Sequence, residues 1–156
     1  MEKITKLRKL FKTFNLDGYI IPKNNNFFGE YVSATEDNLK YISNFTGSAG
    51  FAVVLKKKNY MFVDGRYSIQ ADIQCGEHFQ ICTIPKKYPF NIFKNKNLNL
   101  GFDPKLHTEN SLNRLFGSSF IKLKPINNHT YVTEEISHKN ICFWVFFDAS
   151  YSYIKA

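Results

Sequence analysis

Two short apolar runs on either side of a lysine turn constrain this chain more than any other feature. The stretch FAVVLKKKNYMFVD, residues 51–64, has one run at 51–55, a lysine-rich turn that ends at Asn59, and a second run at 60–63. Runs rich in β-branched and aromatic residues around a short polar turn are typical of a β-hairpin. The sequence therefore predicts a sheet that contains this hairpin.

Helices and further strands are predicted before and after the hairpin. At the N-terminus, Ile4, Leu7, Leu10, Phe11 and Phe14 recur at helical spacing with lysines on the other face, which predicts an amphipathic helix. The other expected elements are a strand at 19–22, a helix over 36–45 opening at Thr35 or Glu36, a helix from Arg66 to about Cys75, a strand near 78–82, a strand at 98–103, a helix opening at Thr108 and a strand at 120–124. This alternation predicts an α/β fold, a mixed sheet flanked by helices.

Composition excludes several classes of protein. The 156 residues are 44% hydrophobic and 17% aromatic, which suits one folded domain and not a disordered chain. The net charge of +8 comes almost entirely from lysines scattered along the chain, and the arginines are Arg8, Arg66 and Arg114. Since a nucleic-acid surface favours clustered charge and bidentate arginines, no nucleic-acid partner is expected.

The location expected is the cytoplasm. The cysteines, Cys75, Cys82 and Cys142, are odd in number and form no CxxC pair, which indicates a reducing compartment. The first residues contain no unbroken apolar stretch of a secretory signal. The aromatic run ICFWVFF, residues 141–147, is shorter than the roughly 20 residues that span a bilayer, so no membrane partner is expected.

A strand-to-helix junction, Asp64-Gly65-Arg66, is the most informative local motif. Asp64 can cap the following helix, and Gly65 can take a positive φ. Arg66 has no local duty of this kind, so two interpretations stay open for it: a surface ion pair, or a guanidinium presented to a carboxylate or carbonyl of a ligand. Upstream, Gly47 and Gly50 in TGSAG should allow a sharp turn or a close backbone approach.

Five collinear motifs carry a family resemblance. LDGYIIP, the pair Glu30-Tyr31, FTGSAG, DGRYSIQA and GFDPKLHT follow one another over roughly residues 4–128. Together they resemble the N-terminal domain of long, three-domain cytosolic Xaa-Pro aminopeptidases, which has the creatinase/prolidase N-terminal fold. Residues 1–128 are accordingly expected to form this domain, and residues 129–156 a divergent aromatic tail.

The resemblance implies a role without chemistry of its own. Enzymes of this family release an N-terminal residue that precedes proline, using two manganese ions held in a C-terminal pita-bread domain that this sequence does not match. The chain is therefore expected to be non-catalytic, with no catalytic residues, no metal site and no cofactor. By resemblance, Arg66 is a substrate contact that acts only in a full enzyme.

The residues themselves supply no alternative catalytic site. The histidines, His78, His107, His129 and His138, lack HxxxH and HExxH spacing, and no carboxylate cluster accompanies them. Nothing in the sequence supplies a base for the three cysteines.

Two functions remain open at this stage, with a basic nucleic-acid-binding domain as a third and weaker alternative, together with three interpretations of the tail. The chain is expected to be either a truncated remnant of an Xaa-Pro aminopeptidase or the binding subunit of a split enzyme, which pairs with a separately encoded catalytic chain or forms a homodimer. The tail is expected to be an out-of-frame end left by truncation or frameshift, a segment docked on the sheet, or a dimer contact.

Overall fold

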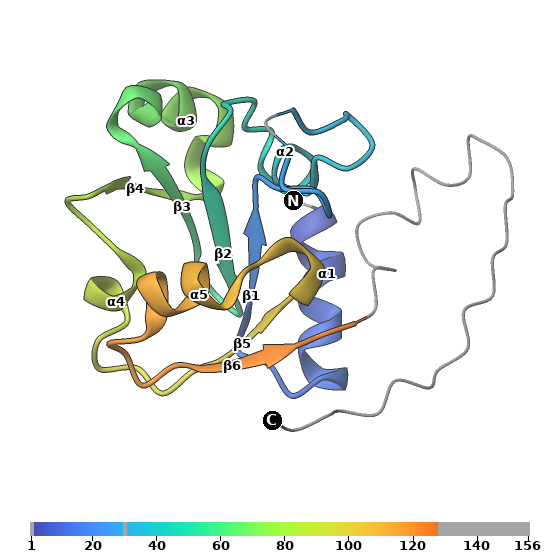
Figure 1. The fold of residues 1–156 in the computed structure, drawn as a ribbon, viewed down its shortest axis with the longest axis vertical. Helices are drawn as coiled ribbons and strands as arrows, with labels where there is room; N and C mark the ends of the chain where they lie inside the picture. The colour runs from blue at the N-terminus through green and yellow to red at the C-terminus, as the bar shows by residue number, and fades with distance from the viewer. Residues whose placement is uncertain (1, 30, 128–156) are drawn as a thin grey trace, which may run out of the picture.

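The structure is a computed structural model that describes residues 2–29 and 31–127. It contains one six-stranded sheet in the order β4-β3-β2-β1-β5-β6, with helices on both faces (Figure 1). The strands are β1 (Gly18–Pro22), β2 (Phe51–Leu55), β3 (Asn59–Asp64), β4 (Gln80–Ile84), β5 (Asn99–Phe102) and β6 (Lys122–Pro125). The helices are α1 (Glu2–Thr13), α2 (Asn38–Ser43), α3 (Ser68–Cys75), α4 (Pro89–Ile92) and α5 (Glu109–Phe116). The mixed sheet flanked by helices confirms the predicted fold class.

Strand β2 alone runs against the others. It pairs antiparallel with β1 and β3, whereas β1 pairs parallel with β5, β3 with β4, and β5 with β6. The remaining five strands therefore all point the same way. We call the edge where these five strands end, and where β2 begins, the carboxyl edge, and the opposite edge the amino edge.

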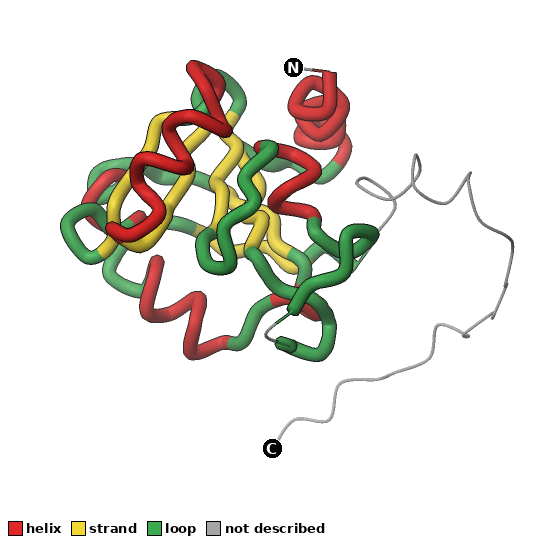
Figure 2. The backbone as a smooth tube through the Cα atoms, turned by 90° about the horizontal axis from the view of Figure 1, so that it is seen from above, coloured by secondary structure: helices red, strands yellow, loops and turns green. Residues whose placement is uncertain are grey.

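Each face of the sheet carries its own apolar core. Strand residues such as Ile21, Val54 and Met61 face the core shared with α1, α2 and α3, while Ile20 and Phe62 face the core shared with α4 and α5. Figure 2 shows these helices on opposite sides of the strands. The hairpin strands are buried on both faces, which is why they read as continuous apolar runs rather than as alternating ones.

Helix boundaries follow local capping. Thr108 caps α5 as predicted, with its hydroxyl oxygen 3.2 Å from the amide nitrogen of Ser111, which donates to it. Helix α2 begins later than predicted, at Asn38, because the carboxylate of Asp37 accepts the amide of Lys40 at 2.9 Å. Helix α4 was not predicted, since four residues are too few to show helical periodicity.

Candidate functional site

The motifs that stand apart in the sequence meet at the carboxyl edge of the sheet. The loop with Tyr31 follows β1, TGSAG leads into β2, DGRY follows β3, and the DPKLHT segment follows β5. Glu30 lies outside the described residues. In open α/β sheets, ligands bind beyond the carboxyl ends of the strands, because loops from several strands converge there. This edge is therefore the candidate functional site.

Asp64 organises the turn after β3. Its Oδ1 accepts the backbone N–H of Arg66 at 2.9 Å and the Nε–H of the same residue at 3.0 Å. The backbone hydrogen bond, followed by the side-chain one, lowers the pKa of Asp64 below its ordinary value. Asp64 thus caps the 3₁₀ turn Gly65–Tyr67, which leads directly into α3.

The prediction that Gly65 takes a positive φ is wrong. Gly65 lies inside the 3₁₀ turn and is not among the glycines with left-handed φ, because such a turn needs negative φ at each residue. A Cβ placed on Gly65 would lie 3.6 Å from Cγ2 of Thr83, an ordinary contact. The backbone at this position therefore tolerates a side chain.

Arg66 has a local partner after all, yet most of it faces solvent. Its side chain is 77% exposed, and its Nε pairs with Asp64 while the guanidinium lies 5.6 Å from the ring centre of Tyr67. Within residues 2–29 and 31–127, its terminal nitrogens donate to no other group. Asp64 raises the pKa of Arg66, so this group stays charged and can bind a carboxylate or carbonyl but cannot act as a base.

The TGSAG loop is fastened to the beginning of α3. The hydroxyls of Ser48 and Tyr67 are hydrogen-bonded at 2.7 Å. One turn further along the helix, Gln74 accepts the amide of Thr46 at 2.9 Å and donates to its hydroxyl at 2.8 Å, and Gln70 donates to the same hydroxyl at 3.0 Å. These bonds fix the DGRY turn relative to the loop that enters β2.

Both glycines of this loop approach neighbours closely. A Cβ on Gly47 would lie 2.2 Å from Cζ of the buried Phe45 ring. Gly50 has φ +156°, and a Cβ there would lie 3.0 Å from the carbonyl oxygen of Phe62. Gly47 thus makes room for a ring, and Gly50 allows the chain to enter β2.

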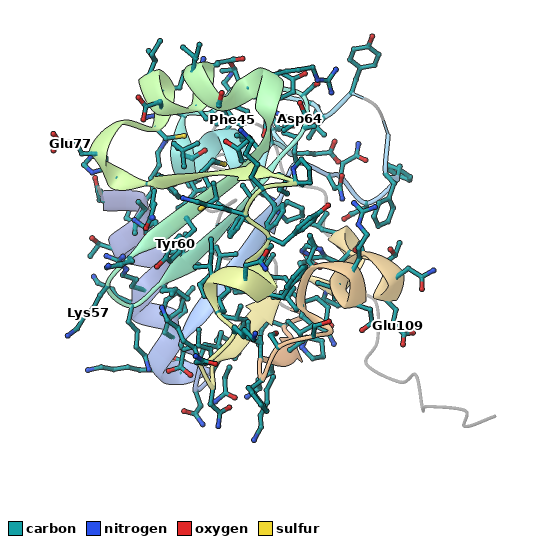
Figure 3. The ribbon with its side chains drawn as sticks, turned by 90° about the vertical axis from the view of Figure 1, so that its left-hand side faces the viewer. Phe45, Lys57, Tyr60, Asp64, Glu77 and Glu109 are labelled. Carbon is teal, nitrogen blue, oxygen red and sulfur yellow. The ribbon has the colours of Figure 1, made fainter. Side chains whose placement is uncertain are left out.

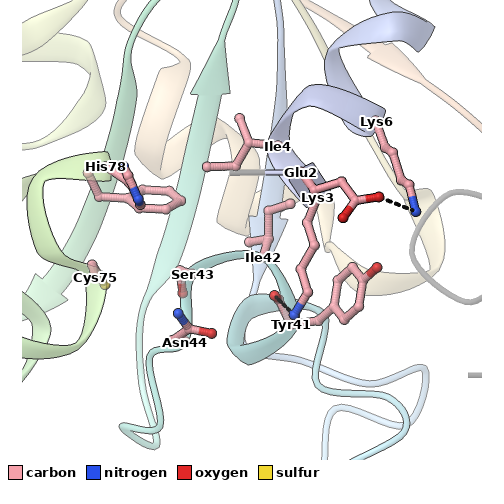
Figure 4. A pocket seen from close by; sticks show the side chains of 11 residues that line it. Glu2, Lys3, Ile4, Lys6, Tyr41, Ile42, Ser43, Asn44, Cys75 and His78 are labelled. Carbon is pink, nitrogen blue, oxygen red and sulfur yellow. Dashed lines mark hydrogen bonds and ion pairs between the residues drawn. The ribbon is translucent and has the colours of Figure 1, made fainter. Parts of the chain in front are cut away.

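A hollow lies between α1, the end of α2 and the end of α3. It has a volume of about 190 Å³, and Figure 4 shows Lys3 and Tyr41 on one side of it with Cys75 and His78 on the other. Burial raises the pKa of the Cys75 thiol to about 11, so at neutral pH it is not a thiolate nucleophile.

The described residues do not fit a pair of manganese ions. Within residues 2–29 and 31–127, no three His, Cys, Asp or Glu side chains gather where they could hold a metal ion. His107 is buried beside Phe102, and this burial lowers its pKa to about 4. His129 and His138 lie outside the described residues. In the same part of the chain, no helix is long and apolar enough to cross a bilayer.

The fold and the carboxyl-edge motifs define a class of protein that comparisons identify. The family model described as "Creatinase/Prolidase N-terminal domain" matches residues 3–130, so the chain belongs to this family. A relative named "Probable Xaa-Pro aminopeptidase P" from Coprinopsis cinerea is 32% identical over 114 residues, which are 69% of this chain but 18% of that protein. The chain therefore matches less than a fifth of this relative's length, its N-terminal domain.

Solved structures agree on the fold. The X-prolyl aminopeptidase of Caenorhabditis elegans, described as a cytosolic enzyme with a di-nuclear active site, has a TM-score of 0.73 and 23% identity over 88% of this chain and 25% of its own. An isolated N-terminal domain of a metallopeptidase from Corynebacterium diphtheriae has a TM-score of 0.63 and 18% identity, covering 80% of this chain and 94% of its own.

Sequence reasoning singled out Arg66 but did not predict the contacts that fasten its turn to the TGSAG loop. The contact between Ser48 and Tyr67 could not be predicted, because a hydrogen bond across 19 positions leaves no local pattern. The two glutamines, Gln70 and Gln74, do carry a signal: at i and i+4 they lie on one face of α3.

Proposed function

We propose that this chain works as the N-terminal domain of an Xaa-Pro aminopeptidase and that it does not hydrolyse peptides by itself. In this proposal, Arg66 binds a carboxylate or carbonyl of a peptide held by a catalytic domain. The observation that carries the proposal is the exposed Arg66 on the turn that Asp64 caps at the carboxyl edge, within a chain that belongs to this domain family. The name of the fungal relative supplies the substrate class.

The described side chains support a non-catalytic role. No group of them suits a metal ion, and burial raises the pKa of the two thiols that the structure describes, Cys75 and Cys82, which makes them less reactive at neutral pH. Ser48 is hydrogen-bonded to a tyrosine hydroxyl and not to a histidine or carboxylate that could act as its base.

A chimera tests both parts of the proposal. The chain alone, assayed with an Xaa-Pro peptide and manganese, should release no N-terminal residue. Residues 1–127 placed on the rest of the Coprinopsis cinerea relative should give activity, and Arg66→Lys should lower kcat/KM by about tenfold, because lysine lacks the bidentate fork. Ser68→Ala near the same turn is the control. Release by the chain alone, or an Arg66→Lys chimera as active as its parent, would contradict the proposal.

A second candidate is a subunit that assembles with a separately encoded catalytic chain. It is favoured by aromatic side chains in the loop after β1: Phe27 is 85% exposed and Tyr31 is 86% exposed. Exposed aromatic residues are typical anchors of protein interfaces. Size-exclusion chromatography of the chain mixed with the catalytic portion of a relative should give a complex, and Phe27→Ser with Tyr31→Ser should abolish it. Elution of two separate peaks for the unaltered chain would contradict this candidate.

A cytoplasmic location completes the proposal. It is supported by the two described cysteines, Cys75 and Cys82, which are free, and by the cytosolic description of the nematode enzyme. Fractionation of cells that express the chain should recover it with cytosolic markers.

A further inference from the structure

Lysines that are scattered along the sequence meet at the amino edge of the sheet. They come from the end of α1, the turn between β2 and β3, the segment before β5 and the first residue of β6. All are exposed: Lys12, Lys56, Lys57, Lys58, Lys94, Lys96 and Lys122. We call these seven residues the lysine row. It lies at the end of the sheet opposite the site at the carboxyl edge, as the positions of Lys57 and Asp64 in Figure 3 show.

Strand pairing brings the parts of the row together. Gly18 of β1 stands beside Leu55 on one side and Leu100 on the other, and Asn99 stands beside Lys122. Neighbouring strands lie about 4.8 Å apart, so these segments span roughly 15–20 Å along the edge. The turn 56–58 and Lys122 therefore lie along one line of strand ends, with Lys12 on the α1 side of the sheet and Lys94 and Lys96 on the α4 side, so that several ammonium groups can contact phosphates of one nucleic-acid strand.

Few carboxylates offset this charge. In the described part of the chain, the acidic side chains at the amino edge are Asp17, which pairs with Lys56 at 2.6 Å, and Glu77. Of the other described acidic residues, Glu2 begins α1 and Asp72 lies on α3, and the rest lie at the opposite edge: Glu36, Asp37, Asp64, Asp103 and Glu109. The amino edge consequently carries an excess of positive charge. The scattered positions of the lysines in the sequence do not reveal this excess.

An exposed aromatic ring accompanies the lysines. Phe120 is 74% exposed and lies two residues before Lys122, where β6 begins. Phenylalanine next to lysines is the combination by which proteins hold single strands, because the ring stacks on a base while the ammonium groups contact phosphates. A membrane surface takes a broad apolar face, whereas the other exposed large hydrophobic side chains of the described residues lie in the loop after β1 and on α3, so a single ring beside the lysine row suits a strand better.

We propose that the amino edge binds single-stranded nucleic acid, with the lysine row on the phosphates and Phe120 stacked on a base. This surface is separate from Arg66, so binding here leaves the carboxyl edge accessible. The interaction is independent of base sequence, since lysine acts as a point charge and the ring accepts any base.

Charge-matched variants of the full chain test this location. Fluorescence anisotropy with a labelled oligouridylate of about 20 nucleotides should show binding that weakens steeply between about 50 and 200 mM salt. The triple variant Lys57→Glu, Lys94→Glu and Lys122→Glu should bind at least about tenfold more weakly and with a shallower salt dependence. The triple variant Lys40→Glu, Lys86→Glu and Lys105→Glu has the same net charge, and its exposed lysines lie outside the row. Its affinity for the oligonucleotide should fall only as much as the change in net charge alone requires, to within about twofold.

Phe120→Ala separates stacking from charge. It should weaken binding by about fivefold or more without changing the salt dependence. Circular dichroism of every variant shows that it is folded. Equal losses in the two triple variants, no binding of the unaltered chain at about 50 mM salt, or binding to phosphatidylserine vesicles but not to the oligonucleotide would each overturn the proposal.

Discussion

The hydroxyl groups of Ser48 and Tyr67 lie 2.7 Å apart and join the loop before β2 to the turn after β3. The ring of Tyr67 also meets that of Phe45 edge-on, with centres 6.0 Å apart. The exposed guanidinium of Arg66, the residue before Tyr67, lies 5.6 Å from the centre of this ring. The contacts of Tyr67 therefore hold in place the ring beside which this guanidinium lies, while Asp64 holds its Nε.

A double-mutant cycle measures this junction. Ser48→Ala and Tyr67→Phe should each lower the free energy of unfolding by about 0.5–1.5 kcal/mol, because each removes one hydrogen bond at the surface. The double variant should lose less than the sum, with a coupling of about 0.5–1 kcal/mol in chemical denaturation. Strict additivity would show that the two hydroxyls do not interact in solution.

Gly47 and Gly65 offer a matched pair of glycines. Gly47→Ala should lower the free energy of unfolding by roughly 1–3 kcal/mol, because its Cβ would lie 2.2 Å from the fully buried ring of Phe45. Gly65→Ala should change it by less than about 0.5 kcal/mol, since φ there is not left-handed and the nearest atom is at 3.6 Å. Thermal unfolding of both variants checks this order, and the reverse order would contradict it.

Lys23 and Asp37 form an ion pair whose side chains are 11% and 6% exposed. Lys23→Met should lower the free energy of unfolding by about 3–5 kcal/mol, because it leaves the Asp37 carboxylate buried without its cation. The exposed pair of Lys6 and Glu2 is the control, and Lys6→Met should cost no more than about 0.5 kcal/mol. Urea unfolding at neutral pH measures both changes, and similar small losses would contradict the distinction.

The ionisation of Asp17 makes the stability of the protein depend on pH. Its carboxylate accepts the amide of Asn99 at 2.9 Å and the ammonium of Lys56 at 2.6 Å, and these bonds lower its pKa. A lowered folded pKa stabilises the protein fully above the unfolded value of about 3.9, and this stabilisation is lost as the pH falls through the folded pKa. Asp17→Asn should thus reduce stability at pH 7 and flatten its decline in acid.

Asp64→Asn is the control for this pH dependence. The pKa of Asp64 is also lowered, but its side chain is 48% exposed, so solvent screens the interaction. Chemical denaturation between about pH 2 and pH 7 should show a smaller change for Asp64→Asn than for Asp17→Asn. An equal or larger effect of Asp64→Asn would contradict the structural role assigned to Asp17.

Several features of the fold could be predicted because their signals are local. The helical spacing of Ile4, Leu7 and Phe11 marks one buried face of α1, and the paired apolar runs mark the hairpin. The capping role of Asp64 could also be predicted, since it needs a side chain two residues from the amide that it accepts. Such features depend on residues within one or two turns of each other.

The sequence by itself determined most of the helices and strands, the class of sheet and the motif that contains Arg66, but not the short helix α4. Only the tertiary structure decided that TGSAG and DGRY share the carboxyl edge and that the lysines form one row at the amino edge. Both outcomes depend on strand order and direction, which arise from packing between residues far apart in the chain. Local patterns carry no information on such pairings. The sequence alone therefore does not show which scattered charges and hydroxyls lie together once the strands are paired.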